Sequence, residues 1–341
     1  MKPLERNIIN EFKGKTILIT GGSGSIGLGL VKQIIHCKPK AIRIFANDEN
    51  SIFETRRTIG DNPLFKYMVG DVRDKDRLQL AIRNVDIVFH AAAMKHIDIC
   101  EQNPFDAVKT NVLGTSNILE ASIIENVLKF IFISTDKATN PTSTLGASKL
   151  LAERLTLDAS TYNENGKTIF AIARFGNVIG SRGSVFQIFY HQIRNGIPLT
   201  VTDPRMTRFI MSISEAASMI LKITHIAKDG EIFILKMPSV RIEDLARSMI
   251  DVYKMRYPNT KNIPPIKISR RTREHERFHE SLVTNDEIPF CHDMGNMYKI
   301  SDVLSKKKIS PAEFNSETAK KISKEKLYNS IKELLDEYIS F

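Results

Sequence analysis

Short apolar runs alternate with longer stretches of helical periodicity over the first half of the chain. The apolar runs have the length of buried strands, and they are Thr16–Thr20, Ala41–Ala46, Phe65–Val69, Asp86–Ala91, Lys129–Ser134 and Thr168–Phe175. The stretches between them carry apolar residues at the spacing of one helix face, and they include Ile26–His36, Lys75–Ile82 and Phe105–Glu125. Strands that alternate with helices predict an α/β fold with a doubly wound parallel sheet.

The regular alternation ends after about Phe175. Glycine, proline and arginine cluster in the strings GNVIGSRGSV and TVTDPRMTRF, which is typical of loops. A strand at Ile232–Lys236, a helix at Ile242–Tyr253 and helix-prone sequence from about Ser323 follow. The pattern predicts a larger domain and a smaller, mixed one, with bounds of 12–176 plus a return segment at about 208–236 for the first, and 177–207 and 237–341 for the second.

Composition narrows the class of protein. The 341 residues are 42% hydrophobic and 26% charged, as in a globular protein with a sizeable core. No apolar run approaches the ~20 residues of a membrane-spanning helix, and the first residues carry no secretion signal. Cys37, Cys100 and Cys291 lie far apart, so we expect reduced thiols in a cytoplasmic protein. The net charge of +10 is dispersed and lacks interleaved aromatic residues, which favours a solvated basic face over a nucleic-acid or membrane partner.

A glycine-rich turn follows the first predicted strand. Gly21, Gly24 and Gly27 are spaced to allow a tight turn, close approach of a pyrophosphate and close packing of helix on strand. The next helix would point free N–H groups and its positive dipole end at the same place. Because the triplet follows a strand and opens a helix, it predicts a Rossmann-type site for NAD or NADP rather than a structural turn. The predicted contacts from this turn are Gly21, Ser23, Gly24, Ser25, Ile26 and Gly27.

The GxxGxxG spacing resembles the extended short-chain dehydrogenase/reductase superfamily, as do the strings GDV, HAAA and TNVLGT after later strands. In that family the GDV aspartate meets the adenine; because RDKDRL follows, Asp71 could also be a helix N-cap, alone or together with that role. No arginine follows Asn47 and Asp48 at the end of the second strand, so the choice between NAD and NADP stays open. The resemblance implies further cofactor contacts from Asn47, Asp48, Asp71, Val72, Ala91, Ala92, Ala93, Lys95 and Asn111.

Candidate acid–base residues follow the fifth predicted strand. This strand ends in Thr135-Asp136-Lys137, and the helix after it carries the string LGASK, which ends at Lys149. Most of the superfamily has YxxxK on this helix, with a lysine that holds the nicotinamide ribose and lowers the pKa of the tyrosine. Leu145 replaces the tyrosine and has no titratable group. Either the fold has become a binding module, or Asp136 and Lys137 carry the chemistry.

The string FISTDKATNPTSTLGASKLLAE favours the second alternative, because it resembles the UDP-N-acetylglucosamine 4,6-dehydratases over roughly residues 14–285. The resemblance implies oxidation at sugar C4 by a tightly held, recycled NAD or NADP, loss of water across C5–C6, and hydride return to C6. Lys137 would be the C5 base, with a pKa far below ~10.4, and Asp136 the acid, with a pKa above ~3.9. Thr135 would bond the 4-oxygen. Lys137, or a relay through water and Lys149, would take the proton of the C4 hydroxyl.

Later loops would hold the nucleotide part of the substrate. Arginine suits paired phosphate oxygens because its donors form a rigid fork. The substrate contacts implied by the resemblance are Lys95, Asn177, Arg182, Arg208, Arg273 and Glu276. The string His275-Glu276-x-x-His279 also matches a zinc-protease motif, which requires a helix. The arginines around it oppose a bound cation, so we expect no metal.

The combined expectation is a cytoplasmic, homo-oligomeric lyase of surface glycan synthesis. The larger domain would hold NAD(P), the smaller one the UDP-sugar, and the product would be a UDP-4-keto-6-deoxy-N-acetylhexosamine inverted at C5. A UDP-N-acetylhexosamine 4-epimerase is the alternative that leaves C6 oxygenated. A catalytically silent NAD(P)-binding sensor is the other, and it would bind cofactor without turnover.

Overall fold

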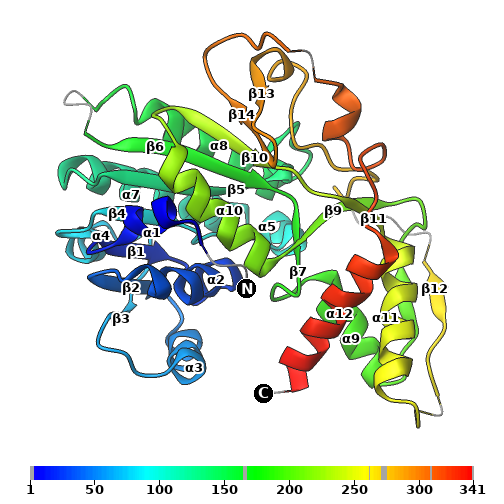
Figure 1. The fold of residues 1–341 in the computed structure, drawn as a ribbon. Coiled ribbons are helices and arrows are strands. Elements are labelled where there is room, and N and C mark those ends of the chain that lie inside the picture. The colour runs from blue at the N-terminus through cyan, green and yellow to red at the C-terminus, as the bar shows by residue number, and fades with distance from the viewer. Residues whose placement is uncertain (1–3, 164–166, 261, 270–274, 308, 340–341) are drawn as a thin grey trace.

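A nine-stranded sheet forms the centre of the computed structural model, which describes residues 4–163, 167–260, 262–269, 275–307 and 309–339 (Figure 1). The strand order is β13-β14-β10-β6-β5-β4-β1-β2-β3. The strands are β1 (Thr16–Thr20), β2 (Ala41–Ala46), β3 (Phe65–Val69), β4 (Ile87–His90), β5 (Lys129–Thr135), β6 (Ile169–Phe175), β10 (Glu231–Leu235), β13 (Cys291–Asp293) and β14 (Met297–Ile300). The order confirms the predicted α/β fold, because β1 lies between β4 and β2 as in a doubly wound sheet.

Helices cover both faces of this sheet (Figure 1). On one face α1, α2 and α10 pack together, and on the other α4, α7 and α8 do so. The helices are α1 (Arg6–Phe12), α2 (Ser25–Ile34), α3 (Glu49–Ile59), α4 (Lys75–Ile82), α5 (Ile97–Gln102), α6 (Pro104–Ala107), α7 (Gly114–Ile124), α8 (Thr144–Asp158), α9 (Val185–Arg194), α10 (Ile213–Ile226), α11 (Ile242–Arg256) and α12 (Lys324–Ile339). Strands covered on both faces are apolar throughout, and β1 is buried at all five positions.

One predicted helix is divided in the structure. The stretch Phe105–Glu125 forms α6, a π-helical turn over Val108–Leu113 and then α7. The wider turn contains Asn111, whose amide bonds to the segment after β4. A π-helical turn of this kind often marks a functional position.

Two small sheets lie beyond the large one, within a region that was expected to be loops. The expectation was wrong for the strings GNVIGSRGSV and TVTDPRMTRF, since the first contains β7 (Asn177–Ile179) and the second contains the start of β9 (Thr207–Ser212). Both are held by pairing with other strands, since β9 lies between β7 and β11 (Ser239–Arg241). A parallel pair completes the region, and its strands are β8 (Leu199–Val201) and β12 (Ile266–Ile268).

A second hydrophobic core stabilises this smaller region. Buried apolar residues of α9, α11 and α12 meet there, among them Phe189, Met249 and Ile331. Residues 291–300 were expected in the smaller domain, yet they form β13 and β14 on the edge of the large sheet. The division of the chain into two domains remains a prediction.

Candidate active site

The glycine-rich turn forms a surface of bare backbone between β1 and α2. Gly21 has a φ of +64°, and a Cβ there would lie 2.7 Å from the amide nitrogen of Ala92. A Cβ on Gly24 or Gly27 would lie 2.9 or 2.5 Å from the carbonyl oxygen of Gly21. Ser25 begins α2, so the N-terminus of the helix faces this turn. Any side chain at these three positions would fill this cradle. The glycines therefore leave room for the pyrophosphate of a dinucleotide.

Polar residues surround the cradle at the ends of β2 and β3. Asp48 caps α3 by accepting the N–H groups of Asn50 and Ser51, and it is exposed. Asp71 accepts a forked hydrogen bond from Arg73, which holds the pKa of this carboxyl below its usual value, with a further bond from Asn47. The N-cap alternative for Asp71 is wrong, because the residue that caps α4 is Asp74.

The segment after β4 approaches the same cradle, and Asn111 holds it in place. Ala91 and Ala92 follow the strand, and the backbone of Ala92 touches the turn at Gly21. The side chain of Asn111 accepts the N–H of Met94 at 2.8 Å and donates to the carbonyl oxygen of Met94 and to Ser148 Oγ, both at 3.0 Å. Asn111 thus ties this segment to α8. Three predicted cofactor residues with no polar side chain, Ile26, Val72 and Ala93, are buried or half-buried.

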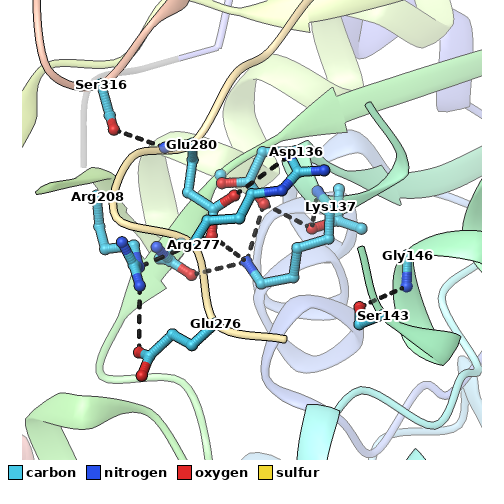
Figure 2. A network of polar contacts seen from close by, with 12 residues as sticks. Asp136, Lys137, Ser143, Gly146, Arg208, Glu276, Arg277, Glu280 and Ser316 are labelled. Carbon is cyan, nitrogen blue, oxygen red and sulfur yellow. Dashed lines mark hydrogen bonds and ion pairs between the residues drawn. The ribbon is translucent and has the colours of Figure 1, made fainter. Parts of the chain in front are cut away.

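The predicted acid–base pair lies at the carboxyl end of β5, where a 3-10 turn over Asp136–Ala138 begins (Figure 2). Lys137 Nζ donates to Asp136 Oδ1 at 2.9 Å and to Asn177 Oδ1 at 3.3 Å. Thr135 Oγ1 donates to the same oxygen of Asp136 at 2.9 Å. Asp136 is completely buried, and its Oδ2 makes no hydrogen bond within the described part of the chain. A buried carboxylate oxygen that accepts no hydrogen bond and lies beside an amine can take part in proton transfer.

A second carboxyl group, which the sequence analysis missed, faces the same amine. Glu280 Oε1 lies 3.7 Å from Lys137 Nζ, and the side chain of Glu280 is only 4% exposed. Burial alone would lower the pKa of Lys137, but the negative charges of Asp136 and Glu280 raise it above its usual value. The expectation of a lowered pKa for Lys137 is therefore wrong, because the charge of Asp136, together with that of Glu280, outweighs the effect of burial.

Lys149 is the buried amine of the site. Its Nζ donates to the carbonyl oxygen of Ile133 at 2.7 Å and lies 4.1 Å from the centre of the Phe132 ring. Burial lowers the pKa of Lys149 to about 7, although the charge of Glu153 opposes the shift. Leu145, one helical turn earlier, is buried against Cys100 and has an apolar role. Lys149 can therefore be a neutral amine near neutral pH.

The predicted substrate residues separate into two groups. Arg208, Glu276 and Asn177 join the acid–base pair, since Arg208 Nη2 donates to Glu276 Oε1 at 3.1 Å and Asn177 accepts from Lys137 (Figure 2). Arg273 lies outside the described residues.

Lys95 and Arg182 lie instead against the glycine turn. The backbone N–H of Arg182 donates to Ser25 Oγ at 3.0 Å, and its guanidinium donates to the carbonyl oxygen of Ser23. Lys95 Nζ donates to the carbonyl oxygen of Arg182 at 2.5 Å, and burial, with the nearby Arg182, lowers the pKa of Lys95. Both cations therefore lie where a pyrophosphate would bind.

The zinc-protease arrangement is not formed, since the described residues 275–280 contain no helix. His275 has a φ of +65°, and its ring contacts the carbonyl oxygen of Thr142. The ring of His279 contacts Thr207 Oγ1. The same HERFHE string ends in Glu280, and the available signal for that residue was its place in a short segment where carboxylates and arginines alternate.

Residues 17–302 match the family described as polysaccharide biosynthesis protein. An uncharacterized membrane protein of Methanocaldococcus jannaschii is 47% identical over 330 residues, which cover 96% of this chain and 98% of that protein. A UDP-glucose 4-epimerase of Rickettsia bellii is 39% identical over 92% of this chain and 89% of its own length. The crystal structure of Pen from Bacillus thuringiensis is similar with a TM-score of 0.87 and 40% identity, covering 94% of this chain and 98% of that one.

The Methanocaldococcus jannaschii relative is named as a membrane protein. Across the described ranges, every helix is too short or too polar to cross a bilayer.

Proposed function

Because the chain belongs to the polysaccharide biosynthesis protein family, within the extended short-chain dehydrogenases/reductases, we propose that it is a UDP-N-acetylglucosamine 4,6-dehydratase. One observation carries the proposal. A buried acid and an amine, Asp136 and Lys137, lie 2.9 Å apart at the carboxyl end of β5. The glycine cradle lies at the same edge of the parallel sheet, so a sugar held against a nicotinamide there could reach both groups.

The cradle of Gly21, Gly24 and Gly27 would hold the pyrophosphate of NAD or NADP, and Asp71 would face its adenine. When bound, the nicotinamide would supply the redox chemistry, by accepting a hydride from sugar C4 and returning it to C6. The remaining predicted contacts, from Asn47 and Asp48 to the Ala91–Ala93 segment, surround the cradle. We propose that the cofactor stays bound and is regenerated in every turnover.

Elimination of water needs a base at sugar C5 and an acid at the 6-hydroxyl. The amine of Lys137 would remove the C5 proton, and Asp136 would protonate the departing oxygen. After the step, Lys137 carries an extra proton and Asp136 lacks one. Because a hydrogen bond of 2.9 Å joins them, the proton can pass directly from Lys137 to Asp136 and reset the pair. Thr135, also bonded to Asp136, would bond the 4-oxygen.

The C4 hydroxyl needs a separate base, because Leu145 replaces the usual tyrosine. We assign this role to Lys149, acting through water, since its amine is buried and its pKa is lowered to about 7. A neutral amine can accept a proton at the pH of the cytoplasm, which is where we place the enzyme.

The nucleotide part of the substrate would be held by the two groups of cations. Arg208, with Glu276 and Asn177, lies beside the acid–base pair, while Lys95 and Arg182 lie on the glycine turn. Guanidinium groups bind phosphate oxygens in pairs, which would fix the UDP moiety. We propose that the product is inverted at C5 and enters the synthesis of a surface glycan.

A second candidate is a nucleotide-sugar 4-epimerase, which the name of the Rickettsia bellii relative favours. Incubation of the purified protein with UDP-N-acetylglucosamine, followed by mass spectrometry and NMR, distinguishes the two. We expect loss of one water and a new C6 methyl group. Unchanged mass with a new C4 configuration would identify an epimerase, and unchanged substrate despite bound cofactor would identify a sensor.

A further inference from the structure

Glu280 has contacts that the proposed function does not yet use. Its Oε1 lies 3.7 Å from both Lys137 Nζ and Arg208 Nε, and its Oε2 lies 3.9 Å from Arg277 Nη1 (Figure 2). The backbone N–H of Glu280 donates to Ser316 Oγ at 2.8 Å, which fixes this end of the segment. Its Oε2 accepts no hydrogen bond from the residues that the structure describes. A buried carboxylate with a free oxygen beside an ammonium group has the geometry of a proton acceptor.

The charges around Lys137 explain why it needs such an acceptor. An amine can remove a proton from sugar C5 only in its neutral form, yet Asp136 and Glu280 favour the ammonium form. Asp136 is reserved for the leaving oxygen and must itself be protonated when elimination begins. Burial raises the pKa of Glu280, while Lys137, Arg208 and Arg277 oppose the shift and Asp136 supports it. Of the two carboxyl groups, Glu280 is the one available to store the proton of Lys137.

We propose that Glu280 is a positioning residue of the acid–base pair, which takes a proton from Lys137 and so produces the free amine. The proposal rests on the dehydratase function above. In this step an N–H bond of the Lys137 ammonium group breaks and an O–H bond forms on the Glu280 carboxylate. The positive charge of Lys137 and the negative charge of Glu280 disappear together, and no electrons are exchanged.

Binding of a nucleoside diphosphate would trigger the transfer. Arg208 is shared between Glu276, at 3.1 Å, and Glu280, at 3.7 Å. A diphosphate that draws the guanidinium of Arg208 toward itself removes a positive charge from Glu280. The carboxylate of Glu280 then binds a proton more readily, and Lys137 can supply it, since the neighbouring arginines stay protonated. The base would thus become active only when substrate is in place.

The pH dependence of turnover tests the proposal, with Glu280→Gln as the variant. In the wild type the proton moves within the site, so the neutral amine forms without loss of a proton to solvent. In Glu280→Gln, Lys137 must release its proton to solvent before it can act as a base. We therefore expect the acid limb of the kcat profile to move up by one pH unit or more. At pH 7, kcat should be at least tenfold lower, with KM unchanged. A uniform loss of kcat at every pH, or an unchanged profile, would overturn the proposal.

Two further variants keep this test decisive. Glu280→Asp retains a titratable group, and we expect it to keep the wild-type acid limb even if kcat falls about tenfold. It also serves as the test if Glu280→Gln does not fold. Glu317→Gln is the matched control, since the side chain of Glu317 is 60% exposed and pairs with His279 rather than Lys137. Its kcat and its pH profile should equal those of the wild type.

An infrared difference spectrum upon addition of UDP tests the same proton without turnover. We expect a protonated carboxyl band to appear in the wild type and to be missing in Glu280→Gln. This result does not depend on which sugar reaction the enzyme performs, so an epimerase could still show it. Absence of the band in a protein that does remove water would contradict the role of Glu280 and leave the dehydratase function standing.

Discussion

The amine of Lys137 contacts two acidic side chains and the amide of Asn177, and this setting makes its role easy to test. Replacing Lys137 by alanine removes the proposed C5 base, so we expect dehydration of UDP-N-acetylglucosamine to fall by about 10²–10⁴-fold. Binding of NAD(P), followed by cofactor fluorescence, should be unchanged. The control is Lys66→Ala, at an exposed position of β3, which should keep full activity. A Lys137→Ala protein with wild-type turnover would rule out this amine as the base.

The buried amine of Lys149 predicts how activity changes with pH. Burial lowers its pKa to about 7, so the folded protein holds a neutral amine above this pH and an ammonium group below it. Only the neutral form can take the proton of the C4 hydroxyl, so we expect kcat to fall as the pH is lowered through about 7. Arginine stays protonated, so Lys149→Arg should lose activity by about 10²-fold or more at every pH from 6 to 9. Steady-state kinetics over this pH range would show whether kcat of the wild type falls below about pH 7, and an unchanged kcat would contradict the role of Lys149.

At the scale of residues, the sequence could predict contacts between neighbours in the chain, but not contacts between segments that only the fold brings together. Asp136 and Lys137 are neighbours in one string, so their pairing could be predicted. Glu280 reaches Lys137 from a distant segment, and its charge adds to that of Asp136 in raising the pKa of Lys137. The placement of Arg182 against Ser23 likewise depends on how the loop after β7 folds back.

The turn between β1 and α2 is the element that the proposed cofactor needs most. Alanine at Gly21 would combine a strained φ of +64° with a Cβ 2.7 Å from the backbone of Ala92. We expect Gly21→Ala to weaken binding of NAD(P) by about tenfold or more, as measured by titration of cofactor fluorescence. Gly230 has a similar φ of +74° but open space around it, so Gly230→Ala is the matched control. Equal affinity in both variants would show that the turn does not contact the cofactor.

A buried ion-pair network joins β6 to α8. Arg174 donates to Glu153 at 2.6 Å and to Glu287 at 2.8 Å, and its side chain is 1% exposed. Glu153 lies one helical turn after Lys149, so this network also holds the helix that carries the buried amine. Arg174→Met leaves Glu153 buried without its partner, and we expect a loss of about 3–5 kcal/mol in the free energy of unfolding, measured by chemical denaturation.

An exposed pair provides the comparison for Arg174. Arg205 bonds to Asp203 with its side chain 73% exposed, and Arg205→Met should leave the free energy of unfolding nearly unchanged. If the two variants lost equal stability, the buried network would have no special role in the fold.

Hydrophobic periodicity predicted the elements of the large sheet well. The bounds of β1, β2 and β3 agree with the predicted runs, and β4, β5 and β6 begin or end within one residue of them. The inner strands are largely apolar because helices cover both faces. The strands β7 and β9 were not predicted because the sequence around them is rich in glycine, proline and arginine. Pairing of β9 with β7 and β11 stabilises these strands, and the local sequence does not indicate that pairing.

At the scale of the molecule, exposed apolar side chains predict self-association. Phe105 of α6 is 82% exposed, and Val108, Leu113 and Leu151 on neighbouring elements are about half exposed. Exposed apolar clusters of this kind mark interaction surfaces, and we expect this one to contact a second copy of the chain. Phe105→Glu should therefore shift sedimentation velocity toward the monomer. Phe53→Glu, at an exposed position of α3, is the control, and a monomeric wild type would contradict the prediction.

The antiparallel strands β13 and β14 at one edge of the large sheet affect how the chain can fold during synthesis. During synthesis β10 leaves the ribosome well before residues 297–300, which are its neighbours in the finished sheet. Until they emerge, β10 is paired only with β6, and its other edge stays open in the nascent protein as a template for wrong partners. Completion of the Rossmann sheet must wait until residues 297–300 have left the ribosome, and a fragment that stops before β14 would be prone to aggregate.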